Sequence, residues 1–196
     1  MTEPIPVPVR PERVADVLLR GPAGRQRARV RWPVALPAAA APALVVLLRA
    51  EGPLTTGALP LDAALVVAVA VAVLTTAPTS VAEALATVEW AADHATELGA
   101  DPDRLVVAGE GPSARQALAV ARAASAGGWP PIERILLVDP EGEPEPAPPG
   151  WAHDLAPVCV VGGGGTFVRA LRDGGAEVTE VTSGALADLP LGPVRR

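Results

Sequence analysis

Three side chains of this 196-residue chain carry the groups that acyl transfer uses: Ser113, Asp139 and His153. A serine hydroxyl attacks a carbonyl carbon when an imidazole removes its proton and a carboxylate orients that imidazole. Only one other histidine is present, His94, and it falls within a predicted helix. One hypothesis is therefore ester or acyl hydrolysis through Ser113, with Asp139 and His153 recruited as its partners.

The positions of these residues along the chain argue against that hypothesis. Ser113 follows a tight turn and falls in the first turn of a predicted helix, where a hydroxyl caps the helix or faces solvent. His153, beside Asp154, is predicted to lie in a polar loop before the next strand. Neither histidine is expected where it could take a proton from a nucleophile at the carboxyl edge of a sheet.

Other kinds of site are weakly indicated. Cys159 lies in an apolar run, which predicts a buried thiol rather than a nucleophile. The turn Gly162–Gly165 precedes a helix and could hold a phosphate through its amides, but neither nucleotide fingerprint is present, so a plain turn is the simpler interpretation. The acidic run 139–146 is interpreted as a solvated loop. We expect neither a metal nor a cofactor.

The elements that must position these residues alternate between strands and helices. Ser80, followed by Glu83 three residues later, predicts the start of the longest helix, and Gly99 its end. The alternation predicts an α/β fold, a three-layer α/β/α sandwich around a mostly parallel sheet of about seven strands. The predicted strands are 25–32, 43–48, 69–74, 105–108, 132–138, 157–161 and 176–181, and the predicted helices are a short one near Asp62, 79–98, 114–126 and 167–173.

Arginine occupies every second position from Arg25 to Arg31, which predicts a strand with one charged face. Such a face could bind anions, but charged side chains also protect an edge strand from pairing with other chains. We favour the edge-strand interpretation.

Composition sets wider limits. Hydrophobic residues make up 49% of the chain and aromatic residues only 3%, so the core must consist mainly of alanine, valine and leucine. A net charge of −6 argues against nucleic-acid binding. The start of the chain lacks a signal-peptide pattern, and the longest apolar run, 63–74, is well short of the roughly 20 residues that a membrane helix needs. We therefore expect a cytoplasmic protein without membrane contact, whose partner and oligomeric state are open.

Three segments are predicted along the chain. Residues 1–20 are expected to form an extended or poorly ordered arm, residues 21–188 the folded domain, and residues 189–196 a tail.

The segment 88–123, VEWAADHATELGADPDRLVVAGEGPSARQALAVARA, resembles the esterases of the hormone-sensitive-lipase branch of the α/β-hydrolase fold. The resemblance is carried by the helix containing Trp90, the connection Gly99–Arg104 and the strand LVVAG that follows. It extends from about Pro22 to Leu186 and implies the core of that fold. Compared with this family, we expect the N-terminal cap helices to be missing and the insertion after the sixth strand to be reduced to 139–156.

The resemblance also implies where catalytic groups belong, and the sequence departs from it at each place. At the nucleophile elbow Gly109 and Glu110 fit the pattern, but the apex, where serine belongs, is Gly111. The oxyanion loop corresponds to Arg49-Ala50-Glu51-Gly52, and the Glu51 carboxylate would repel an oxyanion. The catalytic acid is expected directly after the strand that ends at Val161, but glycines 162–165 occupy that turn. The catalytic base is expected in the turn 182–185, which has no histidine.

We therefore expect no catalytic residues and a catalytically degenerate member of this fold that binds a partner or a small ligand. Weak hydrolysis of carboxylic esters or acyl compounds through Ser113 is the alternative. Phosphate or nucleotide binding at Gly162–Gly165 is a second alternative.

Overall fold

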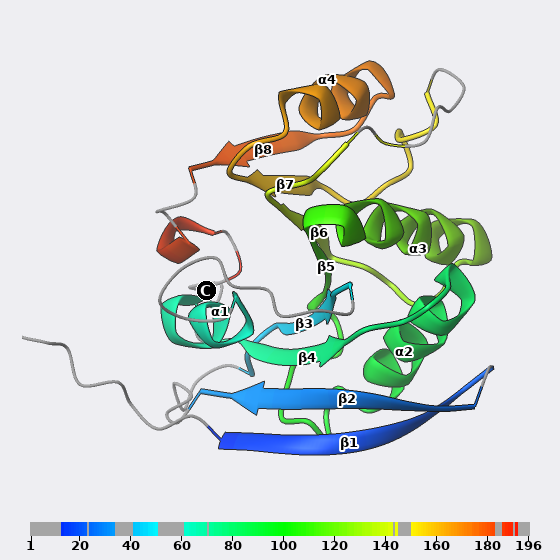
Figure 1. The fold of residues 1–196 in the computed structure, drawn as a ribbon, viewed down its shortest axis with the longest axis vertical. Coiled ribbons are helices and arrows are strands. Elements are labelled where there is room, and N and C mark those ends of the chain that lie inside the picture. The colour runs from blue at the N-terminus through cyan, green and yellow to red at the C-terminus, as the bar shows by residue number, and fades with distance from the viewer. Residues whose placement is uncertain are drawn as a thin grey trace, which may run out of the picture.

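The computed structural model describes residues 13–22, 24–33, 41–50, 61–69, 71–142, 144, 150–182, 186–189 and 191. Their strands form one eight-stranded sheet in the order β1-β2-β4-β3-β5-β6-β7-β8 (Figure 1). The strands are β1 Arg13–Gly21, β2 Gly24–Trp32, β3 Leu44–Leu48, β4 Ala72–Thr76, β5 Leu105–Glu110, β6 Arg134–Val138, β7 Val158–Val161 and β8 Val178–Val181. The helices are α1 Leu61–Val69, α2 Val81–Asp93, α3 Ala114–Gly127 and α4 Gly165–Asp173, with 3-10 turns η1 Gly111–Ser113 and η2 Leu186–Asp188.

Parallel pairing brings the carboxyl ends of most strands to one edge of the sheet. The strands β4, β3, β5, β6, β7 and β8 pair in parallel, whereas β1 with β2 and β2 with β4 pair antiparallel. Residues that directly follow β3, β5, β6 and β7 therefore lie along the same edge. Sites in open α/β sheets form at this edge, because the loops that leave the strands meet there.

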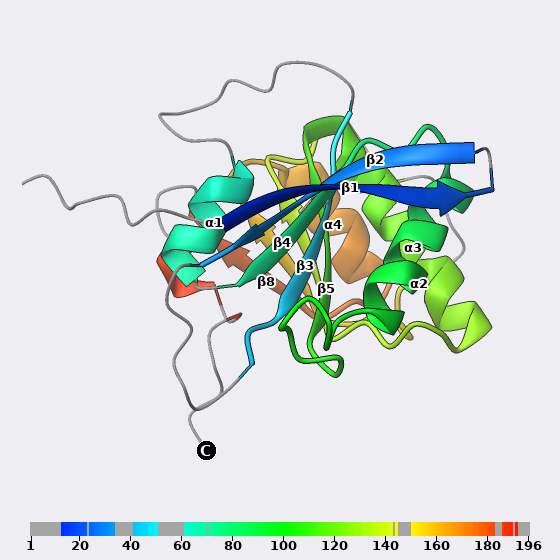
Figure 2. The ribbon, with the colours of Figure 1, turned by 90° about the horizontal axis from the view of Figure 1, so that it is seen from below.

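Helices cover both faces of the sheet, as predicted for a three-layer α/β/α sandwich (Figure 2). Residues of α2, α3 and α4 pack on one face, where Phe167 is the largest fully buried side chain. On the other face, α1 packs with Leu189 and Leu191, which follow η2. Both cores are built mainly from alanine, valine and leucine, which agrees with the composition.

The start of α2 has the Ser80 half of the predicted capping box, whereas the Glu83 carboxylate bonds to Thr79. The Ser80 hydroxyl accepts a hydrogen bond from the Glu83 amide at 3.2 Å, and the Glu83 carboxylate accepts from the Thr79 amide and hydroxyl at 2.8 and 2.7 Å. The helix ends at Asp93, five residues before the predicted end. Turns continue to Gly99, which has a φ of +72°.

The N-terminal part of the sheet differs from the prediction. Residues 13–21 form β1, so the folded domain begins inside the segment predicted to be an arm. As a result β2 lies between β1 and β4, and the edge-strand interpretation of its arginines is wrong. Two of these arginines form ion pairs across neighbouring elements, Arg29 with Asp16 of β1 and Arg31 with Asp62 of α1, each at 2.7 Å.

Two further boundaries can be compared with the prediction. The division of residues 60–74 into a short helix and a strand is confirmed by α1 and β4. At the C-terminal end, Leu189 and Leu191 are buried on the α1 face, so the packed domain includes the start of the predicted tail. None of the helices in the described part of the chain is long and apolar enough to cross a membrane.

Candidate functional site

The turn between β5 and α3 has the backbone of a nucleophile elbow. A Cβ atom on Gly109 would lie 2.5 Å from the carbonyl oxygen of Ser113 and 2.8 Å from the Cα atom of Ala114, so only glycine fits there. At the apex Gly111 has a φ of +55°, in the left-handed region that favours glycine. The strand therefore turns sharply into the helix, as an elbow requires, but its apex has no side chain that could act as a nucleophile.

A carboxyl group from the β6–β7 loop lies beside this apex. A Cβ atom on Gly111 would lie 3.5 Å from Oε1 of Glu141, and the Glu141 amide donates a hydrogen bond to the Gly111 carbonyl at 3.3 Å. The loop is thus held over the turn. A negative charge beside the apex opposes the negative charge that develops on a carbonyl oxygen during acyl transfer.

Glu110, the last residue of β5, forms an ion pair with Arg49, directly after β3. Their side chains are 12% and 17% exposed, and Nε of Arg49 lies 3.6 Å from Oε2 of Glu110. Burial raises the pKa of the Glu110 carboxyl, the nearby carboxylates of Asp139 and Asp62 raise it further, and the Arg49 guanidinium lowers it. Oε2 of Glu110 is buried and has no hydrogen-bond partner in the described residues.

The described part of the predicted oxyanion loop thus brings Arg49 to the elbow, paired with Glu110. Ala50 follows it, and Glu51 and Gly52 lie outside the described residues. The predicted repulsion by Glu51 therefore stays a prediction.

Asp139 connects two turns of the carboxyl edge. It follows β6 with a φ of +44°, and its Oδ1 accepts a hydrogen bond from the Gly163 amide at 3.3 Å. The Gly162 amide donates to the carbonyl of Val181 at 3.0 Å. A carboxylate of the chain itself therefore contacts the glycine turn where a phosphate was considered.

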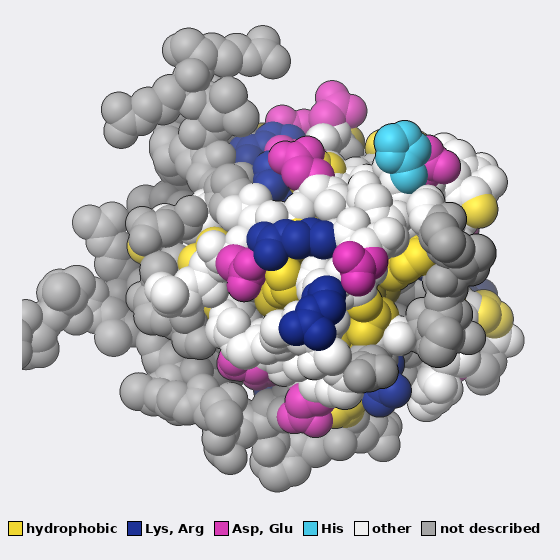
Figure 3. Space-filling view, turned by 90° about the horizontal axis from the view of Figure 1, so that it is seen from above, with side chains coloured by type: hydrophobic (Ala, Val, Ile, Leu, Met, Phe, Trp, Pro, Cys, Tyr) yellow, Lys and Arg dark blue, Asp and Glu magenta, His cyan; other side chains and the backbone are white. Residues whose placement is uncertain are grey.

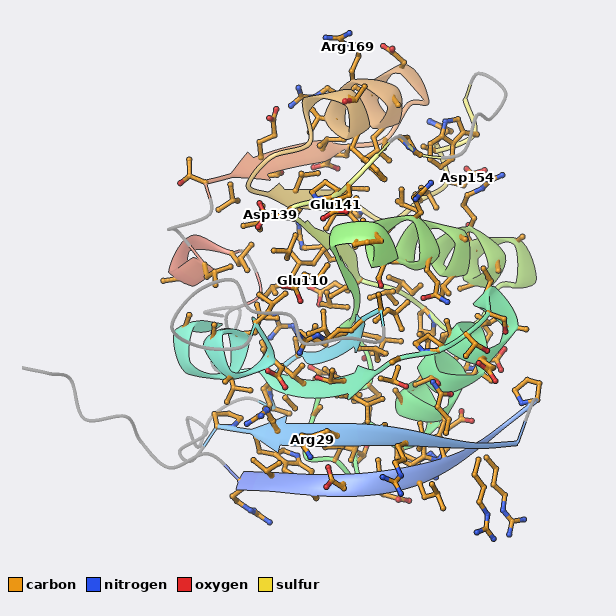
Figure 4. All side chains as sticks on the ribbon, viewed as in Figure 1. Arg29, Glu110, Asp139, Glu141, Asp154 and Arg169 are labelled. Carbon is orange, nitrogen blue, oxygen red and sulfur yellow. The ribbon has the colours of Figure 1, made fainter. Side chains whose placement is uncertain are left out.

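Figure 4 shows Glu110, Asp139 and Glu141 around the ends of β5 and β6, whereas Asp154, the neighbour of His153, lies beside the far part of α3. The Ser125 hydroxyl donates to the Asp154 carbonyl at 3.1 Å. Ser125 is separated from Ser113 by twelve residues, which in a helix correspond to about 18 Å. The structure therefore does not bring Ser113, Asp139 and His153 together.

His94 also lies away from the elbow. It is the C-cap of α2, its ring stacks on Trp90 at 4.4 Å, and its Nδ1 lies 2.8 Å from the Trp90 carbonyl oxygen. The end of α2 leads back toward the start of β5, so this histidine belongs to the amino edge of the sheet. His94 and His153 are the two histidines of the chain.

Ser113 and Cys159 are both buried. Ser113 is 5% exposed and precedes α3, but its side chain makes no capping hydrogen bond, so the predicted capping or solvent-facing role is wrong. Burial raises the pKa of the Cys159 thiol, as expected for a thiol that packs as a small apolar side chain. Neither residue is presented to solvent as a free nucleophile.

Sequence reasoning did not find the contact of Glu141 with the apex or the pairing of Arg49 with Glu110. Glu141 belongs to an acidic, proline-rich run that was interpreted as a solvated loop, and no local signal showed that the loop returns to β5. The pair of Arg49 and Glu110 could have been suspected, because both residues end neighbouring parallel strands and have opposite charges.

Comparison with known proteins agrees with the fold and its branch. Residues 63–170, more than half of the chain, match the family model of the alpha/beta hydrolase fold. The chain is 30% identical over 203 residues to esterase LipI of Mycobacterium tuberculosis, an alignment that covers 93% of this chain and 63% of that esterase. The chain thus spans less than two thirds of that relative.

Solved esterase structures have the same fold. A thermostable esterase from Pseudomonas putida has a TM-score of 0.69 and 18% identity, over 90% of this chain and 74% of that one. For a fungal esterase from Rhizomucor miehei the TM-score is 0.72 with 15% identity, over 88% and 74%. The chain belongs to the α/β-hydrolase fold family, and the resemblance to its hormone-sensitive-lipase branch is confirmed.

Proposed function

We propose that this protein binds a partner or a small ligand on an α/β-hydrolase fold and does not cleave esters through an acyl-serine intermediate. The observation that carries the proposal is the apex of the elbow. Gly111 stands there without a nucleophile, and Oε1 of Glu141 lies 3.5 Å from the position that a Cβ atom of residue 111 would take.

The charges around the apex also support this proposal. Loss of one oxyanion-hole donor costs an esterase-type site about 2.7–4 kcal/mol of transition-state stabilisation, and the members of a triad act as a unit. At this elbow the carboxyl groups of Glu110 and Glu141 accompany the Arg49 guanidinium, which is paired with Glu110, and both histidines lie elsewhere. Acyl transfer at this elbow would therefore lack a nucleophile, a general base and electrostatic stabilisation of the negatively charged transition state.

Hydrolysis of p-nitrophenyl butyrate tests the proposal. We expect the purified protein to release p-nitrophenol no faster than the Ser113→Ala variant does. The substitution removes one buried hydroxyl that makes no capping bond, so the variant should fold and serve as a matched control. Turnover that disappears in Ser113→Ala would overturn the proposal.

An esterase that uses Ser113 is the second candidate function, and the similarity to proteins named esterases favours it. It requires that Asp139 and His153 reach Ser113, although His153 lies beside the other end of α3. This candidate predicts that turnover is lost in both Ser113→Ala and His153→Ala. Turnover unchanged in both variants would eliminate it.

A further inference from the structure

A groove separate from the elbow lies between the start of α2, the outer side of α3 and the loop after β6. Its volume is about 830 Å³, within the roughly 300–1,000 Å³ typical of small-molecule sites. Pro112, next to the elbow apex, forms one end of the wall. The lining residues include Ser80, Val81, Arg115, Leu118, Arg122 and Trp151.

Among the described residues that line this groove, the charged ones are Arg115 and Arg122. Arg115 and Arg122 stand seven residues apart on α3, which places them on the same side of the helix two turns apart. No aspartate or glutamate is among the described lining residues, although the whole chain has a net charge of −6.

An apolar wall stands beside these cations. The indole ring of Trp151 lies under the Arg122 guanidinium, whose Cζ is 5.1 Å from the ring centroid. Trp151 also packs closely on Gly174, where a Cβ atom would collide with the indole. Leu118 and the 40%-exposed Val81 extend the apolar surface. One guanidinium is thus held against the apolar wall.

We propose that this groove binds a small organic anion with an apolar body. Arg115 and Arg122 contact its anionic head, a carboxylate or a phosphate, and Trp151 with Leu118 contacts the body. Guanidinium groups suit such heads because they donate several hydrogen bonds in one plane. The inference names the ligand class of the proposed binding function and rests on it in this respect only, since the groove does not include Gly111.

A pair of fluorescent probes separates charge from apolar contact. The anionic probe is 1-anilinonaphthalene-8-sulfonate, and N-phenyl-1-naphthylamine is its uncharged counterpart. We expect Arg115→Gln and Arg122→Gln each to weaken binding of the sulfonate about tenfold, as loss of a charge-assisted hydrogen bond does. The same variants should change the affinity for the uncharged probe less than twofold.

The control variant is Arg169→Gln on α4, a helix that contributes no residue to the groove. Figure 4 shows Arg169 pointing away from the body of the molecule. On this end of the molecule, cationic and acidic side chains are interleaved (Figure 3), and Arg172 pairs with Glu180 at 2.8 Å. Arg169→Gln should leave the affinity for both probes unchanged. Equal weakening by all three variants would overturn the proposal, because it would show a response to net charge alone.

Competition identifies the head group and the body. Decanoate and decyl phosphate should displace the sulfonate probe, and decanol should do so only at much higher concentration. Displacement by decanol as strong as by decanoate would contradict the proposal. These results are independent of ester turnover. If the probes do not bind, the groove proposal is wrong, but the proposal that Gly111 prevents acyl transfer still stands. If turnover depends on Ser113, the proposal for Gly111 is wrong, but the groove proposal still stands.

Discussion

The elbow and the groove between α2 and α3 meet at Pro112 but differ in charge and in the role of their backbone. Three carboxyl groups, those of Glu110, Asp139 and Glu141, lie around the elbow, with Arg49 paired to Glu110, whereas the groove presents the guanidinium groups of Arg115 and Arg122. The elbow backbone is tightly packed at Gly109, whereas the groove is a solvent-accessible space of about 830 Å³. An anion is thus disfavoured at one surface and favoured at its neighbour.

This contrast separates the packing of an elbow from its chemistry. Gly109 is required because β5 and the start of α3 approach each other within contact distance of its missing Cβ. That requirement belongs to the fold and holds whether or not residue 111 is a nucleophile. The presence of an elbow therefore indicates the family, and the side chains around it must indicate the activity.

The largest effect is expected from Gly109→Ala. Its methyl group would collide with the backbone of Ser113 and Ala114, which should lower the free energy of unfolding by about 2–3 kcal/mol, in the range of overpacked cores. Gly127→Ala is the matched control at the other end of α3, where nothing lies within 4 Å of the added atom. It should stabilise the protein by about 0.5–1 kcal/mol. Urea unfolding measures both, and equal effects would contradict the tight packing of the elbow.

A smaller effect is expected from Gly174→Ala, which tests the groove wall. The added methyl would displace the Trp151 indole, so we expect a loss of about 1 kcal/mol in stability and a several-fold weaker affinity for the uncharged probe. Gly163→Ala serves for comparison, because its Cβ atom would meet nothing within 4 Å. Unchanged binding in Gly174→Ala would show that Trp151 does not form the wall.

The smallest effect concerns titration at the elbow. The pKa of Glu110 should lie above its ordinary value of 4.5 because the carboxyl is buried, and that of Glu83 below 4.5 because Thr79 donates two hydrogen bonds to it. Carboxyl carbon shifts measured by NMR against pH check both directions. A Glu110 pKa at or below 4.5 would mean that Arg49 outweighs burial.

The same shift has a consequence for stability. A raised pKa means that the folded protein binds more protons than the unfolded chain between pH 4.5 and the folded pKa, so stability falls as the pH rises through that interval. Glu110→Gln should remove this fall. Urea midpoints of the variant and the wild-type protein measured on both sides of the interval test the sign.

Local signals predicted much of the fold. The predicted capping box at Ser80 and Glu83 involves residues three apart, and the hydrogen bond of its Ser80 half forms within one turn of helix. The buried strands were found because continuous apolar runs lie in the middle of the sheet. In contrast, β1 was missed because Val17, Leu18 and Leu19 break the alternation expected of a strand, and its pairing with β2 supplies the order that its own pattern lacks.

The site was less predictable because its contacts join distant segments. The sequence placed Gly111 at the apex, since the residues around it follow the pattern of the family. The position of Glu141 depends on the path of the β6–β7 loop, and the burial of Ser113 depends on how α3 packs on β5. Neither follows from the types of the neighbouring residues.

Treatment of the native protein with a fluorophosphonate, followed by its intact mass, tests the central claim most directly. The reagent phosphonylates a serine whose hydroxyl is activated by a nearby base. We predict that the mass remains that of the unmodified chain, because the apex is Gly111 and no histidine lies close to Ser113. An increase by one phosphonyl group that is absent from Ser113→Ala would contradict the account.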